Sequence, residues 1–149
     1  MTPVIAVNGY DEGVTYELAT CGYFDYRPSM GVAVVTSLGV PDLFRREAHC
    51  STLKPKGVFN VYKTKRAFEV HYMDRLDAHA AEIAAELKKI ATSNGNEPLV
   101  LLCYCNLSQP DAWCHRRMAA AWLEEHTGIT IPELGQCRPE NLYPDKSLF

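Results

Sequence analysis

Two short apolar runs with a long helical pattern between them constrain the fold of this chain more than any other feature. The runs are "VAVV" (Val32–Val35) and "LVLLC" (Leu99–Cys103), and neither alternates with polar residues. Strands of parallel sheets, which are buried on both faces, have this composition. Between the runs, residues 64–93 carry apolar side chains at helical spacing, namely Leu76, Ala80, Ile83, Ala84, Leu87, Ile90 and Ala91. We therefore expect a strand, one or two helices, and a second strand.

The rest of the chain extends this strand–helix–strand pattern. Residues 111–126 have a second helical pattern that ends at Thr-Gly, and residues 129–134 ("ITIPEL") predict a short last strand or extended piece. Residues 3–7 predict a further short strand, whereas residues 8–30 and 41–60 are expected to be irregular, with a short hairpin or a helical turn at most. This order of elements predicts an α/β fold with a mainly parallel sheet and flanking helices.

The composition and the charge narrow the class of protein. The 149 residues suit one domain, residues 1–149, and a content of 47% hydrophobic and 22% charged residues is typical of a globular protein. The net charge of −3 gives no overall attraction to nucleic acid. No apolar run reaches the ~20 residues of a membrane span, and the N-terminus lacks the basic and then apolar pattern of a signal peptide. We expect a cytoplasmic protein with no membrane partner.

Three of the six cysteines gather in the stretch "LVLLCYCNLSQPDAWCHRR". In a reducing cytosol such a cluster indicates metal binding, catalysis or burial rather than disulfides. Cys103 and Cys105 stand two apart at a strand end, so their side chains point the same way in an extended chain. Cys114, His115 and Arg116 fall in the first turns of the following helix. There, backbone N–H groups and the helix dipole favour an anion and lower the pKa of a thiol.

The first apolar run contributes residues to the same edge of the predicted sheet. Thr36 and Ser37 follow this run directly. Ligands of parallel α/β sheets bind where the carboxyl ends of strands lead into helices. We therefore expect a polar pocket at this edge. The predicted ligand-binding residues are Arg116, Thr36, Ser37, Cys105 and Tyr72.

Three interpretations of the cysteine stretch stay open. In the first, Cys114 is a nucleophile or forms a redox-sensitive pair with Cys103, and His115 is the base; these three are the predicted catalytic residues. In the second, zinc is bound by thiolates and an imidazole, the candidate ligands being Cys103, Cys105, Cys114 and His115. The spacing argues against zinc, because the adjacent Cys114 and His115 point ~100° apart on a helix. In the third, the cysteines are only core residues.

Basic residues with aromatic residues between them precede and begin the long helical pattern. A groove that binds single-stranded nucleic acid has this mixture, and so does a solvated loop face. The residues are Arg45, Arg46, Lys54, Lys56, Lys63, Lys65 and Arg66, with Tyr62 and Phe68 interleaved.

A strand that ends in Leu-Cys and a helix that opens with Cys-His-Arg form a recognisable combination. Here these elements are Leu102-Cys103 and Cys114-His115-Arg116, and "SLGVP" follows the first apolar run. Over about residues 31–134 the chain resembles the bacterial and phage "domain of unknown function 488" family, although Cys105 stands near a position where that family often has an acidic residue. The resemblance implies an α/β fold with a site at the strand–helix junction. It leaves residues 1–30 and 135–149 as extensions.

The expected function is the binding or processing of a phosphate-bearing ligand, a nucleotide or a nucleic acid, by a Cys/His/Arg site at a strand-to-helix junction. The helix N-terminus and Arg116 would hold the anion, and Cys114 or His115 would carry the chemistry of an enzyme. One alternative is a zinc-stabilised binding module for a protein or nucleic-acid partner. The other is a phage or stress-related interaction protein with only structural cysteines.

Overall fold

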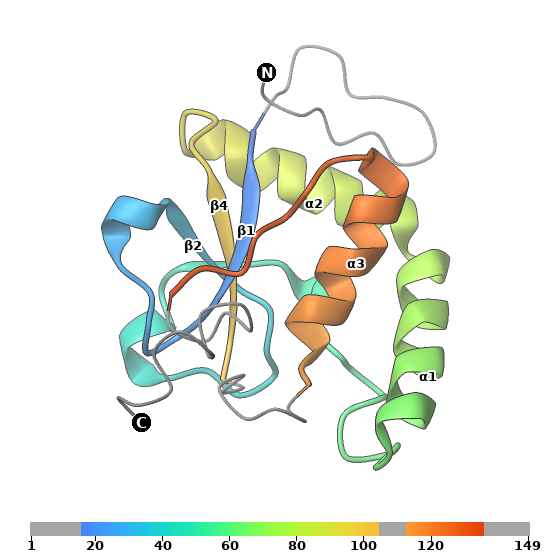
Figure 1. Cartoon of the computed structure of the whole chain (residues 1–149). Coiled ribbons are helices and arrows are strands. Elements are labelled where there is room, and N and C mark those ends of the chain that lie inside the picture. The colour runs from blue at the N-terminus through green and yellow to red at the C-terminus, as the bar shows by residue number, and fades with distance from the viewer. Residues whose placement is uncertain (1–15, 105–112, 136–149) are drawn as a thin grey trace, which may run out of the picture.

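A computed structural model of the chain describes residues 16–104 and 113–135, and its architecture is the expected α/β domain (Figure 1). One sheet has the strand order β1-β4-β2-β3, and every neighbouring pair is parallel. Its strands are β1 (Leu18–Gly22), β2 (Val32–Val35), β3 (Ala48–His49) and β4 (Leu99–Cys103). The helices are α1 (Lys65–Ala78), α2 (Ala80–Ser93) and α3 (His115–Thr127), with 3-10 turns at Pro28–Met30, Asp42–Phe44 and Ser51–Leu53.

The two predicted apolar strands are confirmed as the neighbouring strands β2 and β4. The chain passes from β2 to β4 through α1 and α2, which is the crossover that a parallel pair requires. β4 lies between β1 and β2, and all five of its residues are buried. This position inside the sheet explains why β4 is the most continuous apolar run of the chain.

The three helices pack against one face of the sheet, and loops cover the other face. Leu99 and Leu101 of β4 belong to a large core that includes residues of all three helices. Val100 and Leu102 point the other way, into a smaller core that loop residues complete. Because side chains alternate along a strand, Cys103 faces the helices, at the end of β4 that lies near the start of α3.

One segment differs from its sequence prediction. β1 lies within residues 8–30, which the sequence predicts to be irregular, and its burial arises from pairing with β4. Residues 129–134, predicted to be a short last strand or an extended piece, are an extended piece with one isolated parallel bridge, between Glu133 and Thr20. The strand predicted at residues 3–7 lies outside the described residues.

The helix boundaries follow from local backbone conformation. The long helical pattern is two helices, because His79 (φ −115°, ψ 22°) ends α1 and precedes α2. α3 begins at His115, since Cys114 is extended (φ −154°, ψ 147°), and it ends at Thr127, because the next residue, Gly128, is left-handed (φ 75°). The predicted start at residue 111 is too early, because Trp113 and Cys114 are not helical, although residue 111 itself lies outside the described residues. Across the two described ranges, no helix has the length and apolar character needed to cross a membrane.

Candidate functional site

The carboxyl ends of β2 and β4 bring the two halves of the predicted site together. Cys103 is the last residue of β4, and Thr36 directly follows β2. Thr36 donates to the carbonyl of Leu102 through its N–H (3.1 Å) and its hydroxyl (2.8 Å). These bonds tie the two strand ends together and hold Thr36 next to His115, the first residue of α3.

The three predicted catalytic residues form a buried cluster at this edge. The sulfur atoms of Cys103 and Cys114 and a ring nitrogen of His115 all lie within 4.8 Å of one another. Because Cys114 is extended, its Sγ lies 3.8 Å from Nδ1 of His115. The prediction that these adjacent side chains diverge is therefore wrong, since only His115 is helical. Cys105, the fourth predicted metal ligand, lies outside the described residues.

The imidazole of His115 has a defined orientation. Its Nε2 lies 2.8 Å from the carbonyl oxygen of Thr36 and 3.4 Å from the Thr36 hydroxyl. A carbonyl can only accept, so Nε2 carries the ring proton and Nδ1 keeps a lone pair toward Cys114. Burial is the largest effect on the pKa of His115 and lowers it, and the charge of Arg116 also lowers it. Cys103 and the hydrogen bond to the Thr36 carbonyl act to raise this pKa but do not outweigh burial. His115 is therefore suited to act as a neutral base or ligand.

The guanidinium of Arg116 is fully buried and joins the two thiols to a carboxylate. Its Nη1 donates to Sγ of Cys103 at 2.9 Å and to Sγ of Cys114 at 3.8 Å. On its other side, Nε and Nη2 donate to Glu133, with the closest contact at 2.7 Å. Burial alone lowers the pKa of Arg116, but the Glu133 carboxylate and the two thiols outweigh burial and raise it. The side chain predicted to hold the ligand directly is thus occupied by the protein's own groups.

Glu133, Arg117 and Thr20 belong to the same network, and of these Glu133 and Thr20 were not considered as site residues from the sequence. Thr20 donates its hydroxyl to Glu133 at 2.6 Å, and Arg117 donates to the Thr20 hydroxyl at 2.8 Å while lying 4.0 Å from the carboxylate. Two guanidinium groups thus share one carboxylate among the described residues, which leaves one excess positive charge in this network. The sequence signal for Glu133 is a single acidic residue within the apolar "ITIPEL".

Ser37 and Tyr72, both predicted to bind ligand, take part in the surrounding structure. The Ser37 hydroxyl bonds to the Tyr23 hydroxyl and to the Gly39 carbonyl, each at 2.6 Å. Burial raises the pKa of Tyr23 to about 12, so this phenol stays protonated. Tyr72 is fully buried, donates its hydroxyl to the Leu53 carbonyl, and sets its ring edge-on to His115 with centroids 5.8 Å apart. Tyr72 is thus placed to support the His115 ring.

A pocket of about 220 Å³ leads to this cluster from the surface. Four aromatic residues line it, and the buried Cys114 and His115 form its inner end. Figure 1 shows the segment before α1, which supplies part of the lining, beside the start of α3. The aromatic residues are Phe59, Tyr62, Phe68 and Trp113.

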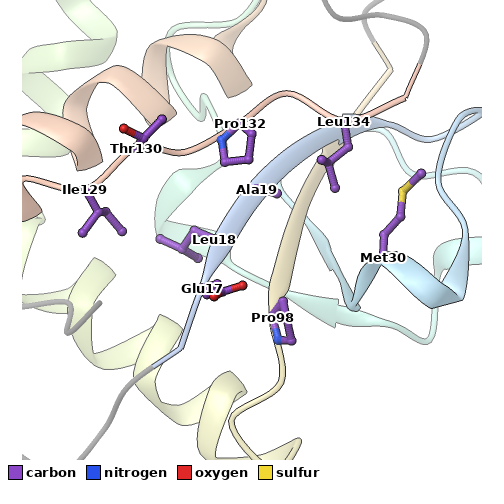
Figure 2. A pocket seen from close by; sticks show the side chains of 9 residues that line it. All are labelled: Glu17, Leu18, Ala19, Met30, Pro98, Ile129, Thr130, Pro132 and Leu134. Carbon is purple, nitrogen blue, oxygen red and sulfur yellow. The ribbon is translucent and has the colours of Figure 1, made fainter. Parts of the chain in front are cut away.

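A second pocket, of about 550 Å³, lies at a different part of the sheet (Figure 2). Glu17, Leu18 and Pro98 line it near the amino ends of β1 and β4, and Pro132 and Leu134 line it from the segment after α3. Ligands of parallel α/β sheets bind at the carboxyl ends of the strands. The smaller pocket, which reaches Cys114, is therefore the candidate site.

Comparisons with protein-family models, with curated proteins and with solved structures gave no significant match. The function is therefore argued from the geometry and the chemistry of the site.

Proposed function

We propose that this protein binds a phosphate-bearing ligand, a nucleotide or a nucleic-acid end, at the carboxyl edge of its sheet and processes it through the thiol of Cys114. One observation carries the proposal. Arg116 contacts both Cys103 and Cys114 while Nδ1 of His115 faces Cys114, and all of these groups meet at the start of α3. A cation and a base around one thiol are what a nucleophilic cysteine requires.

The start of α3 supplies the anion-binding part of this function. The Cys114 carbonyl accepts from the N–H groups of Arg117 and Met118, and the dipole of the 13-residue helix that starts there favours negative charge at its N-terminus. The excess positive charge of Arg116, Arg117 and Glu133 adds to this preference. Arg116 contributes through its charge and through the thiols, because Glu133 occupies two of its nitrogen atoms.

The chemical roles of the two thiols follow from where they lie. Cys114 lines the pocket, whereas Cys103 is fully buried behind it against Arg116. When Cys114 reacts, its proton passes from sulfur to Nδ1 of His115, while Nε2 keeps its proton on the Thr36 carbonyl. In this proposal the Cys114 thiolate forms a bond to phosphorus while the bond from phosphorus to the leaving oxygen breaks, and the proton on Nδ1 of His115 passes to that oxygen. Cys103 helps to hold the guanidinium beside Cys114.

The test is alkylation of the native protein by iodoacetamide, with the site of labelling identified by peptide mass spectrometry. Cys50 is the internal control, because its buried thiol contacts the Glu86 carboxylate and both effects raise its pKa. We expect Cys114 to react faster than Cys50 at pH 7.5 and to be protected by pyrophosphate or by a nucleoside monophosphate. The Cys114→Ser variant should bind these ligands more weakly than the parent. Equal reactivity of the two thiols with no protection would overturn the proposal.

A second function is favoured by the mutual distances in the same cluster. Two sulfur atoms and one ring nitrogen within 4.8 Å are close enough to share one zinc ion, for which thiolates and an imidazole are common ligands. The bond from Nε2 of His115 to a backbone carbonyl is also the usual way to orient a metal-binding histidine. In this function the protein is a zinc-stabilised binding module for a protein or nucleic-acid partner.

Cobalt(II) distinguishes the zinc module from the thiol enzyme, because cobalt bound to thiolate absorbs in the near ultraviolet. A zinc module predicts one equivalent of cobalt per chain, with the thiolate band weakened in both Cys103→Ser and Cys114→Ser. The phosphate-ligand function predicts no such stoichiometric band. Chelator-induced unfolding of the protein as purified would count for the zinc module as well.

A further inference from the structure

We infer that a nucleotide lies along the aromatic pocket beside Cys114, with its base stacked at the pocket mouth on Phe59 and its phosphate directed toward Cys114 and the start of α3, where Lys63 adds positive charge. The inference rests on the proposed function and names the ligand class of the same site. The observation behind it is an aromatic lining that extends from the exposed Phe59 to the buried Cys114 and His115.

The size and the lining of the pocket suit a planar ring. Its volume of about 220 Å³ is below the range of about 300–1,000 Å³ that is usual for larger ligands. Trp113 is held against Phe68 with ring centroids 5.2 Å apart, and Tyr62 stacks on His71 at 3.7 Å. These contacts hold two walls of the pocket in place before a ligand arrives. Aromatic side chains held in this way are typical platforms for stacking of nucleic-acid bases.

Phe59 leaves apolar surface at the pocket mouth. Its side chain is 52% exposed, and that of the nearby Val61 is 59% exposed. A stacked base would cover the Phe59 ring and remove apolar area from water. The amide of Asn60, which also lines the pocket, offers both a donor and an acceptor to the edge of a base.

The charge around the pocket selects an anionic ligand. Residues 54–66, "KPKGVFNVYKTKR", contain five basic residues and no acidic one, although the whole chain has a net charge of −3. Lys63 of this segment lines the pocket. An aromatic cavity with a positively charged side chain in its lining matches a base that is joined to a phosphate.

A base joined to a phosphate can belong to a free nucleotide or to the terminal nucleotide of a nucleic-acid strand. Both present one base and one terminal phosphate. A 5′-phosphorylated trinucleotide and its unphosphorylated counterpart distinguish the two sources. If the phosphorylated trinucleotide displaces the mononucleotide and the unphosphorylated one does not, the ligand is the end of a nucleic-acid strand. If neither trinucleotide displaces the mononucleotide, the ligand is a free nucleotide.

The test compares adenosine, guanosine, cytidine and uridine monophosphates with ribose 5-phosphate, which carries the phosphate and no base. Isothermal titration calorimetry measures each affinity. We expect at least one mononucleotide to bind about tenfold tighter than ribose 5-phosphate. Phe59→Ala should remove about tenfold of mononucleotide affinity and leave ribose 5-phosphate unchanged. Phe24→Ala, at a 79% exposed phenylalanine outside the pocket lining, is the matched control and should change neither.

A second variant tests the phosphate part separately. Lys63→Ala should weaken mononucleotides and ribose 5-phosphate by the same factor, and Lys89→Ala on the exposed side of α2 should weaken neither. The base-binding inference is overturned, and the phosphate function stands, if ribose 5-phosphate binds as tightly as every mononucleotide and Phe59→Ala has no more effect than Phe24→Ala. Failure of all of these ligands to bind would overturn both.

Discussion

Glu133 is the residue that allows Arg116 to be buried. Its carboxylate accepts hydrogen bonds from Arg116 and from Thr20, and its side chain is 2% exposed. A guanidinium without this partner would be an uncompensated charge inside the core, and breaking such a pair costs about 3–5 kcal/mol. The position of Arg116 between the two thiols therefore depends on a residue from a different segment of the chain.

Replacing the carboxylate with an amide of the same shape tests this dependence. We expect Glu133→Gln to lower the free energy of unfolding by about 3 kcal/mol, measured by urea denaturation at pH 7. Glu125→Gln, at an exposed position of α3, is the matched control and should stay within about 0.5 kcal/mol of the parent. A loss of stability no larger than that of the control would contradict the role given to Glu133.

Gly31 is a second residue whose identity is dictated by its surroundings. Its φ is 139°, and a Cβ atom built there would lie 2.4 Å from the carbonyl oxygen of Pro98. Gly57 also has positive φ, 81°, but nothing lies within 4 Å of an added Cβ. We expect Gly31→Ala to be less stable than Gly57→Ala by about 1–3 kcal/mol, because only the former adds a clash to the backbone strain. Thermal unfolding of the two variants side by side measures the difference, and equal midpoints would contradict the clash.

At the scale of elements, α2 holds the short 3-10 turn Ser51–Leu53 in place through Glu86. The Glu86 carboxylate accepts from the N–H of Thr52 at 3.0 Å, from its hydroxyl at 2.7 Å, and from the Cys50 thiol at 3.4 Å. Burial acts to raise the pKa of Glu86, but the hydrogen bonds from Thr52, Ser51 and Cys50 outweigh burial and lower it. The ionised form is therefore the one that stabilises this contact.

The sign of the pH dependence follows from that lowered pKa. A carboxyl that is more acidic in the folded state contributes stability above its unfolded pKa, near 4.5, and loses it as the pH falls through the folded value. We expect Glu86→Gln to be less stable than the parent at pH 7 and to lose less stability between pH 6 and pH 3. Urea denaturation across this range measures both, with the exposed Glu97→Gln as control. Parallel pH profiles for Glu86→Gln and the parent would contradict the assignment.

The elements that sequence reasoning predicted are those whose burial is reflected in a local run of apolar residues. Val32–Val35 and Leu99–Cys103 are continuous apolar runs because they are buried on both faces, so the pattern alone locates them. β1 has the sequence "LATCG", which mixes apolar and polar residues. Its Thr20 is satisfied by Glu133, which is distant in the sequence. No local pattern encodes such a partner, so β1 was predicted to be irregular.

The candidate site also has a part that the sequence predicts and a part that depends on tertiary structure. The proximity of Cys103, Cys114 and His115 follows from the order of a strand and a helix, and sequence reasoning placed them together. The partners of Arg116 depend on how the segment after α3 returns to β1, which is a tertiary feature. The conformation of Cys114 as the residue before the helix also decides whether its thiol meets His115, and the sequence alone does not specify that boundary.

At the scale of the whole molecule, the two pockets lie at opposite ends of the strands. The net charge is −3, yet the basic segment 54–66 and the thiol cluster meet in one pocket at the carboxyl end of the sheet. The larger pocket of Figure 2 lies near the amino ends of β1 and β4. With all three helices on one face, α1 and α3 pack against each other, and the pocket lies between the segment before α1 and the start of α3.

Native mass spectrometry tests the central claim most directly, namely that the cluster of Cys103, Cys114 and His115 serves a phosphate-bearing ligand. The protein is purified under reducing conditions without chelator and measured alone and with a nucleoside monophosphate. The account predicts the mass of the bare chain or of the chain with a phosphate-bearing adduct, and the uptake of one mononucleotide that is reduced in Cys114→Ser. One zinc ion per chain, absent from Cys103→Ser and Cys114→Ser, with no uptake of nucleotide, would contradict it.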